Sequence, residues 1–286
     1  MAVTASDRKA LQSYVRTLDR DIQNELQRYI KQAILAGSSI GEIRKASKEL
    51  AKSLRTIFRE SAKVAIETGS AGTKTMALKY AKKVEAVSGL QKSKVDAMVG
   101  LDFGGGLEKK VLDAVWNKVW PDSQTVEDRI NRLTSSARIK AEQIMRSGIE
   151  EGLSAQNIAK EMALKLDIER KAAFRLAAHT TNMAYHEANA EIAMDMSFIM
   201  GIRIMRGVLG PASETCDICE EHGGPADGAG QEYLKSDFGG RDIDLWAMTN
   251  SPPYHPNCNC DLEYIEMDAA EFVQYAREKY GKRRAD

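Results

Sequence analysis

The sequence lacks the features of several common protein classes. No apolar run approaches the roughly 18 residues that a membrane-spanning helix needs. The opening residues, MAVTASDRKALQSYV, contain no apolar segment behind a basic start, so they predict no secretory signal. Cysteine is absent before Cys216, and all four cysteines lie between that residue and Cys260. With 43% hydrophobic and 29% charged residues, the chain has a globular composition, and we expect it to fold in the cytosol without a membrane partner.

The sequence also lacks the motifs of common enzyme classes. It contains no nucleophile elbow, no Walker A sequence and no dinucleotide-binding fingerprint. His186 and Glu187 begin like the zinc-protease motif H-E-x-x-H, but Ala190 stands where the second histidine belongs. Histidines seven residues apart on one helix face, such as His179 and His186, are more often structural residues than ligands. We therefore predict no catalytic residue and no enzyme activity.

The net charge of zero hides a strong asymmetry along the chain. Residues 1–100 carry nineteen lysines and arginines against ten acidic residues, whereas residues 101–286 carry twenty-two against thirty-one. A basic N-terminal part is typical of a surface that faces nucleic acid or an acidic protein. A solvated helix face would have the same composition, so both interpretations stay open.

Helical periodicity dominates the chain up to about residue 198. From Ser6 to Ala36, apolar residues recur at three- and four-residue steps, which predicts one long amphipathic helix. We expect Gly37 to cap its C-terminus, and Ser39 with Glu42 forms a capping-box pattern that opens a second helix. Further helices are expected from Leu107 to Val119, from Ser123 to Glu151, after a cap at Ser154, and from Ile168 to Met196.

Glycines predict the breaks between helical segments. Gly69 and Gly72 are expected to interrupt the second helix, so that a third segment follows. Three successive glycines at 104–106 predict a hinge, because they lack the lysine and the spacing of a phosphate-binding loop. We therefore expect a basic helical arm or bundle at 1–103 and a helical domain at 104–198.

The pattern changes after residue 198. Residues 199–208, IMGIRIMRGV, alternate apolar and polar side chains, and residues 261–267, DLEYIEM, predict a second strand. The Gly- and Asp-rich stretch between them is far longer than an ordinary loop, so something must hold it. Asp268 is expected to cap a C-terminal helix. The predicted fold class is mainly α, with long N-terminal helices, a helical middle region and a small α+β module at 199–286.

All four cysteines lie in or at the end of that long stretch. Cys216 and Cys219 form a C-x-x-C pair in TCDIC, while PPYHPNCNC contains His255 and the C-x-C pair Cys258 and Cys260. Two close pairs separated by a loop are typical of a tetrahedral Zn²⁺ site, since each pair supplies two ligands from a tight turn. The alternative is a set of buried or redox-active thiols. We predict that four of these five residues bind a Zn²⁺ ion that staples the C-terminal module.

The choice among these ligands stays open at this point. The four cysteines are the simplest set, His255 with Cys260 could replace Cys258, and His222 is a weaker candidate. Four protein ligands leave no position for water, which predicts a structural rather than a catalytic ion. Residues 214–268 carry two basic and thirteen acidic side chains, which would repel phosphate. Any DNA contact therefore belongs to the N-terminal helices or to the basic C-terminal tail, Lys282-Arg283-Arg284.

This order of motifs resembles a known family. A helical region with LAAHTTN at 176–182 precedes a short strand, the C-x-x-C pair, a Gly-rich loop and H-P-N-C-x-C before a second strand. Residues 107–265 thereby resemble the phage minor head, or head morphogenesis, proteins related to the F protein of phage Mu. The H-P-N-C-x-C element, His255 to Cys260, is the most specific part of the resemblance. Family members often have an arginine, a threonine and an acidic residue where this chain has HTTN, so a role for that arginine is not carried over.

The resemblance implies a structural component of a tailed-phage head. Such a protein is expected to assemble in the host cytoplasm and to stay in the virion near the portal, acting in head assembly and in DNA packaging or ejection. Its implied partners are the portal protein, other head proteins and, through the basic N-terminal region, packaged DNA. The alternative is a metal-dependent enzyme of the head, a nuclease with an open site at His255 and loop aspartates, or a transferase. Four protein ligands around the ion would favour the structural role, and three ligands plus water would favour the enzyme.

Overall fold

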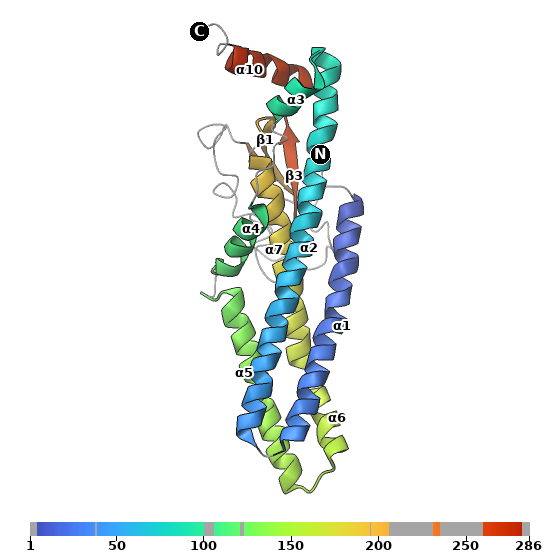
Figure 1. Ribbon diagram of the computed structural model, residues 1–286, viewed down its shortest axis with the longest axis vertical. Coiled ribbons are helices and arrows are strands. Elements are labelled where there is room, and N and C mark those ends of the chain that lie inside the picture. The colour runs from blue at the N-terminus through green and yellow to red at the C-terminus, as the bar shows by residue number, and fades with distance from the viewer. Residues whose placement is uncertain are drawn as a thin grey trace. The chain divides into compact units, whose positions relative to one another are not determined.

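Among the residues that the structure describes, the fold is mainly helical with a small antiparallel sheet, which agrees with the mainly α class and the short C-terminal strands expected from the sequence. The computed structural model describes residues 5–37, 39–99, 106–120, 123–194, 196–205, 231–234 and 260–281. In chain order the elements are α1 (Ala5–Ala36), α2 (Ile40–Ser88), α3 (Lys92–Val99), α4 (Leu107–Asn117), α5 (Val126–Glu150), α6 (Ala155–Lys165), α7 (Asp167–Met194), β1 (Ile199–Met205), β2 (Gln231–Leu234), β3 (Asp261–Glu266) and α10 (Ala269–Gly281). Figure 1 shows these elements. None of the described helices is long and apolar enough to cross a membrane.

The chain divides into two compact units, each assembled from segments that are distant in the sequence. The first, here called the helical unit, comprises Leu11–Val64 and Leu112–Asn182. The second, here called the sheet unit, comprises Met1–Ala10, Ala65–Val111 and Met183–Asp286. The sequence predicted three consecutive regions, at 1–103, 104–198 and 199–286. These domain boundaries stay a prediction.

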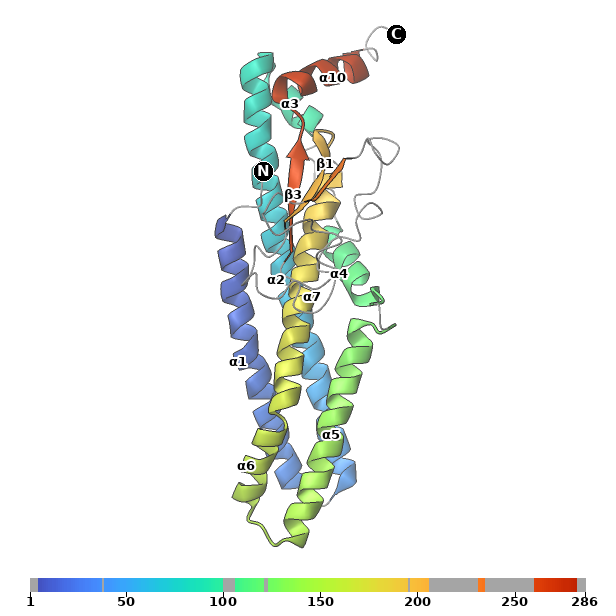
Figure 2. The same ribbon diagram turned by 180° about the vertical axis from the view of Figure 1, so that it is seen from behind.

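The helical unit is held by apolar packing between amphipathic helices. In it α1, the first part of α2 and α5 run alongside one another (Figures 1 and 2). Leu18, Ile22 and Phe58 are almost completely buried, because the three- and four-residue spacing directs one face of each helix inward. A hydrogen bond also joins α2 to α5, in which the Ser47 hydroxyl donates to the Thr134 carbonyl oxygen at 3.2 Å.

An ion pair on the surface of the helical unit joins α2 to the start of α5. The Arg55 Nε atom donates to the Glu127 carboxylate at 2.8 Å, and its Nη2 atom donates to the Asn131 side-chain oxygen at 2.8 Å. Hydrogen bonding to Arg55 holds the pKa of Glu127 below its usual range. Because both side chains are about one-third exposed, this pair stabilises the unit only modestly.

Helix α2 corrects one prediction from the sequence. Gly69 and Gly72 were expected to interrupt the second helix, but α2 continues through both to Ser88. A Cβ atom at Gly69 would lie 2.8 Å from the Tyr185 carbonyl oxygen of α7, a distance that Cβ atoms do not adopt. Glycine therefore stands at 69 because α2 and α7 approach closely there, and not because the helix ends.

The described residues of the sheet unit include three antiparallel strands in the order β2-β1-β3. Both strands expected from the sequence are present. Strand β1 is described as far as Met205, and the expected residues 206–208 lie outside the described residues, while β3 ends at Glu266 rather than Met267. The edge strand β2, with the sequence QEYL, was not predicted. Its Tyr233 pairs with Ile202 of β1, while Tyr264 of β3 pairs with Ile202 from the other side.

An aromatic cluster forms the core of the sheet unit. The ring of Tyr80 on α2 stacks on Phe198 with a centroid separation of 3.9 Å, and it meets Phe272 of α10 edge-on at 5.7 Å. The Tyr80 hydroxyl donates to the Met267 carbonyl oxygen at 2.9 Å. Burial raises the pKa of Tyr80, because the phenolate would lose its solvation. This cluster fixes α2, β1 and α10 around one centre.

Several helix boundaries confirm the capping signals in the sequence. Gly37 adopts a positive φ of 55° directly after α1 ends, and Gly152 adopts a positive φ of 68° two residues after the end of α5. The Ser154 side chain accepts a hydrogen bond from the Asn157 backbone N–H at the start of α6. Asp268 does the same for α10, accepting from the Ala270 N–H at 2.8 Å. The expected hinge glycines 104 and 105 lie outside the described residues.

Candidate functional site

The candidate site is the end of the sheet where β1 finishes and β3 begins. The two segments that carry the cysteines are connected to the strands there. The last residue of β1, Met205, pairs with the first residue of β3, Asp261, and Ile204 pairs with Gln231 at the start of β2. The segment with the C-x-x-C pair follows the end of β1, and the H-P-N-C-x-C segment ends at the start of β3. The sheet therefore brings the beginning of one segment next to the end of the other.

Only one of the five predicted metal ligands is among the described residues. Cys216, Cys219, His255 and Cys258 lie outside them, as do His222 and the loop aspartates. Cys260 is described, directly before β3, and its side chain is only 2% exposed. It belongs to the apolar core of the sheet unit.

The position of Cys260 follows from the two-residue period of a strand. Leu262 and Tyr264 are 2% and 1% exposed, so alternate residues from 260 onward lie on the buried side of the sheet. Glu263, between them, lies on the partly exposed side. The surroundings of Cys260 are thus those of a core residue, since cysteine behaves as a small apolar side chain when buried in this way.

A charge network on the exposed side of the sheet joins all three strands. Arg203 of β1 donates through Nε to Glu232 of β2 at 3.0 Å and through Nη1 to Glu263 of β3 at 2.8 Å. Hydrogen bonding to Glu232, and then to Glu263, raises the pKa of Arg203. This network was not predicted from the sequence, where its only signal is one arginine in β1, one glutamate in β2 and two in β3. It helps to set the strand register at the site.

Gly201 permits the close approach of β2 to β1. A Cβ atom at this position would overlap the Tyr233 carbonyl oxygen and would lie 3.0 Å from the Leu234 Cα atom. Both atoms belong to the backbone, so no side-chain adjustment would make room. The edge strand β2 therefore depends on glycine at position 201.

The histidines of α7 are buried, as expected for structural residues. His179 is 5% exposed and meets the Trp120 ring edge-on at 4.5 Å, and the Arg129 guanidinium covers Trp120 at 3.9 Å from the ring centroid. His186 is 1% exposed and lies against Tyr185. Trp120 is itself a core residue, since it is 6% exposed.

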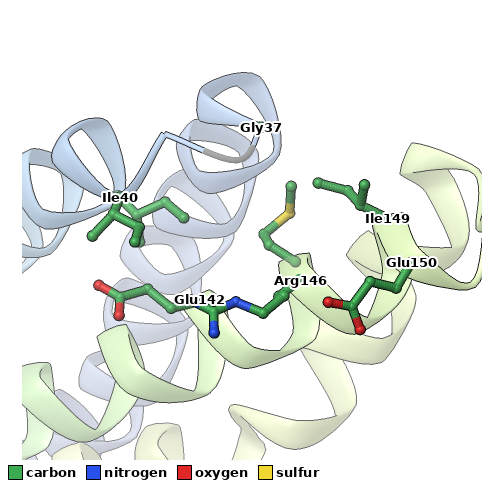
Figure 3. A pocket seen from close by; sticks show the side chains of 8 residues that line it. Gly37, Ile40, Glu142, Arg146, Ile149 and Glu150 are labelled. Carbon is green, nitrogen blue, oxygen red and sulfur yellow. The ribbon is translucent and has the colours of Figure 1, made fainter.

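A small pocket in the helical unit was not expected from the sequence. Its volume is about 150 Å³, and Figure 3 shows the turn between α1 and α2 facing the C-terminal half of α5 across it. It is lined by Gly37, Ile40, Ile43, Glu142, Met145, Arg146, Ile149 and Glu150. This volume is below the roughly 300 Å³ of typical ligand sites, and the lining has no nucleophile beside a base.

Within the described ranges, no three His, Cys, Asp or Glu side chains gather closely enough to hold a metal ion. The donor set of the predicted site, four thiols and an imidazole, fits Zn²⁺ by its chemistry. Comparison with known proteins gives no match to a family model, to a curated protein or to a solved structure.

Proposed function

We propose that the protein is a structural minor head protein of a tailed phage, acting at or near the portal in head assembly and in DNA packaging or ejection. The observation that supports this proposal is the order and pairing of α7, β1 and β3. Helix α7 carries LAAHTTN, β1 follows it, and β3 follows the H-P-N-C-x-C element, which is the order on which the family resemblance rests. Met205 pairs with Asp261, so the segment with the C-x-x-C pair begins next to the strand residue at which the H-P-N-C-x-C segment ends.

We further propose that a structural Zn²⁺ ion staples the C-terminal module. The ligands would be Cys216, Cys219, His255 and Cys258, with Cys260 as the one predicted ligand that the ion leaves out. The burial of Cys260 supports this choice, because apolar surroundings disfavour the thiolate that a zinc ligand must be. A closed set of four protein ligands contributes folding free energy and leaves no position for a reactive water.

The metal proposal is tested by elemental analysis of the purified full-length chain. We expect one zinc ion per chain, with loss of near-UV circular dichroism when a chelator removes it. Replacing Cys258 by serine is expected to abolish zinc binding, whereas the matched variant Cys260→Val is expected to keep it. Zinc loss in the Cys260 variant alone would show that the ligand set is wrong, and absence of metal from the wild-type protein would contradict the whole site.

The head role is tested by co-expression with the portal protein of the same phage. We expect the chain to co-sediment with portal rings, and a mutant phage without it to make heads that fail in packaging or ejection. A chain that never co-sediments with portal rings or heads, and whose zinc keeps an open position with bound water, would instead support the enzyme alternative.

A further inference from the structure

The outer face of α1 has an unusual composition. Between Leu11 and Ala36 the exposed positions hold four basic side chains, six uncharged polar side chains and one apolar side chain, and none is acidic. The basic residues are Arg16, Arg20, Arg28 and Lys31; the polar ones are Gln12, Ser13, Gln23, Asn24, Gln27 and Gln32. The apolar one is Leu35, at the end of the helix, where it is 78% exposed.

Most of these residues form one continuous stripe. Positions 12, 16, 20, 23, 27 and 31 recur at three- and four-residue steps, so they share one side of the helix. At a rise of 1.5 Å per residue, the stretch from Arg16 to Lys31 is about 22 Å long. We refer to these six residues as the α1 stripe.

The acidic residues of α1 between Leu11 and Ala36 do not neutralise this stripe. Asp19, Asp21 and Glu25 are only partly exposed; Asp19 pairs with Arg170 of α7, and Glu25 pairs with Arg28 at 2.6 Å. In the part of the chain that the structure describes, Arg16, Arg20 and Lys31 form no ion pair. Their charges therefore face solvent without an internal partner.

The neighbouring helix shows that this composition is not general in the helical unit. The exposed side of α2 carries Lys45, Lys48 and Lys52, but Glu42 and Glu49 lie among them. Mixed signs of this kind are typical of a solvated helix face. The acid-free stripe of α1 is therefore not explained by solubility alone.

The chemistry of the α1 stripe fits a phosphate backbone better than another protein. Arginine, lysine, glutamine and asparagine are the side chains that contact phosphate oxygens, and such contacts need no apolar surface. A protein interface has a buried apolar or aromatic core and is depleted in lysine, and the stripe offers no apolar side chain. Single-stranded nucleic acid would need aromatic side chains for base stacking, which the exposed positions also lack.

We propose that the α1 stripe binds the phosphate backbone of double-stranded DNA without sequence preference. This inference rests on the proposed function for its biological setting, in which packaged DNA is the duplex. The binding itself depends only on the charges of α1. The N-terminal and C-terminal parts of the chain would then have different roles. Residues 214–268 carry thirteen acidic and two basic side chains and would repel the same duplex.

The test is DNA binding by the full-length protein as a function of salt. The variant carries Arg16→Gln, Arg20→Gln and Lys31→Gln, since glutamine keeps helix propensity while removing the charge. Fluorescence anisotropy with a labelled DNA duplex gives the dissociation constant between 50 and 200 mM salt. Each lost phosphate contact lowers the magnitude of the slope of log affinity against log salt by about 0.9. The slope of the triple variant should therefore be smaller in magnitude than that of the wild type by about 2.7. Over this range the wild-type affinity should therefore fall roughly fortyfold more than that of the variant.

The matched control removes three exposed positive charges elsewhere in the helical unit. Arg132, Lys160 and Lys165 are exposed on α5 and α6. Asp128 lies four residues before Arg132, and Glu161 lies next to Lys160 and four residues before Lys165. Replacing these three by glutamine changes the net charge equally and should leave the salt slope within about 0.5 of the wild-type value. Far-UV circular dichroism checks that both triple variants keep their helices.

The proposal would be overturned by no duplex binding by the wild-type protein, by an unchanged salt slope in the triple variant, by an equal loss of slope in the control variant, or by tighter binding to single strands. A triple variant that keeps its DNA affinity but no longer co-sediments with portal rings would assign the stripe to an acidic protein surface instead. If portal co-sedimentation fails in the wild type while the salt slope behaves as expected, the head role is contradicted and the DNA surface stands.

Discussion

Replacing Gly69 by alanine tests the close approach of α2 to α7. In an open helix position this change stabilises by about 1 kcal/mol, because alanine has the higher helix propensity. At Gly69 the new methyl group would lie 2.8 Å from the Tyr185 carbonyl oxygen and 3.3 Å from the Asn189 amide nitrogen. Overpacking of this kind costs about 1–3 kcal/mol, and the backbone oxygen cannot rotate away. We expect Gly69→Ala to lower the free energy of unfolding by up to about 2 kcal/mol in net terms, since the gain in helix propensity offsets part of the overpacking cost.

The matched control is Gly41→Ala in the same helix. The nearest atom to a Cβ at Gly41 is the Ser39 hydroxyl oxygen at 4.0 Å, so the added methyl group meets no obstacle. This variant should be as stable as the wild type or more stable by up to about 1 kcal/mol. Urea unfolding followed by circular dichroism at 222 nm measures both. A Gly69→Ala protein as stable as Gly41→Ala would refute the close approach and favour a simple helix break at Gly69.

Two further predictions concern pH. Tyr80→Phe removes a buried hydrogen bond and should cost about 1 kcal/mol at pH 8. Because burial raises the folded-state pKa of Tyr80 above its unfolded value near 10, the wild type should lose stability as pH rises beyond 10. The variant should lose less over the same range in urea titrations, and an unchanged alkaline loss would contradict this. Glu127→Gln should cost less than about 1 kcal/mol at pH 7, since the pair is partly exposed. The lowered pKa of Glu127 means that this contribution is present above about pH 4.5 and disappears on acidification, so the two proteins should converge in stability near pH 2.

The helices could be predicted from the sequence because their signals are local. Three- and four-residue periodicity, Gly37 and Gly152 at positive φ, and caps at Ser154 and Asp268 all act within one or two turns. The glycine at 69 was misinterpreted because its reason is tertiary. Its propensity suggests a break, whereas the approach of Tyr185, distant in the sequence, requires the missing side chain.

The sheet was only partly predictable for a related reason. Strand β1 has an alternating pattern of its own, but the four-residue β2 is defined by its pairing with β1 and by the space that Gly201 leaves. The side of the sheet on which Cys260 lies depends on strand register, which spacing alone does not give. The cysteine spacing thus indicated a candidate ligand set, and the burial of Cys260 indicates which member to omit.

The α1 stripe illustrates what a structure adds to a count of charges. The excess of lysine and arginine in residues 1–100 was compatible with a nucleic-acid surface and with a solvated helix face. Knowing which positions are exposed separates α1, whose exposed charges are all basic between Leu11 and Ala36, from the mixed face of α2. The composition of a segment can be counted from the sequence, but the composition of a surface can be determined only when the fold is known.

The measurement that tests the central proposal most directly is quantitative mass spectrometry of purified, DNA-filled particles of the phage that encodes this chain. A structural minor head protein should be present in every preparation at a low and constant ratio to the portal protein, and should remain after the tails are removed. Absence of the chain from particles that are otherwise complete would contradict a structural role in the head.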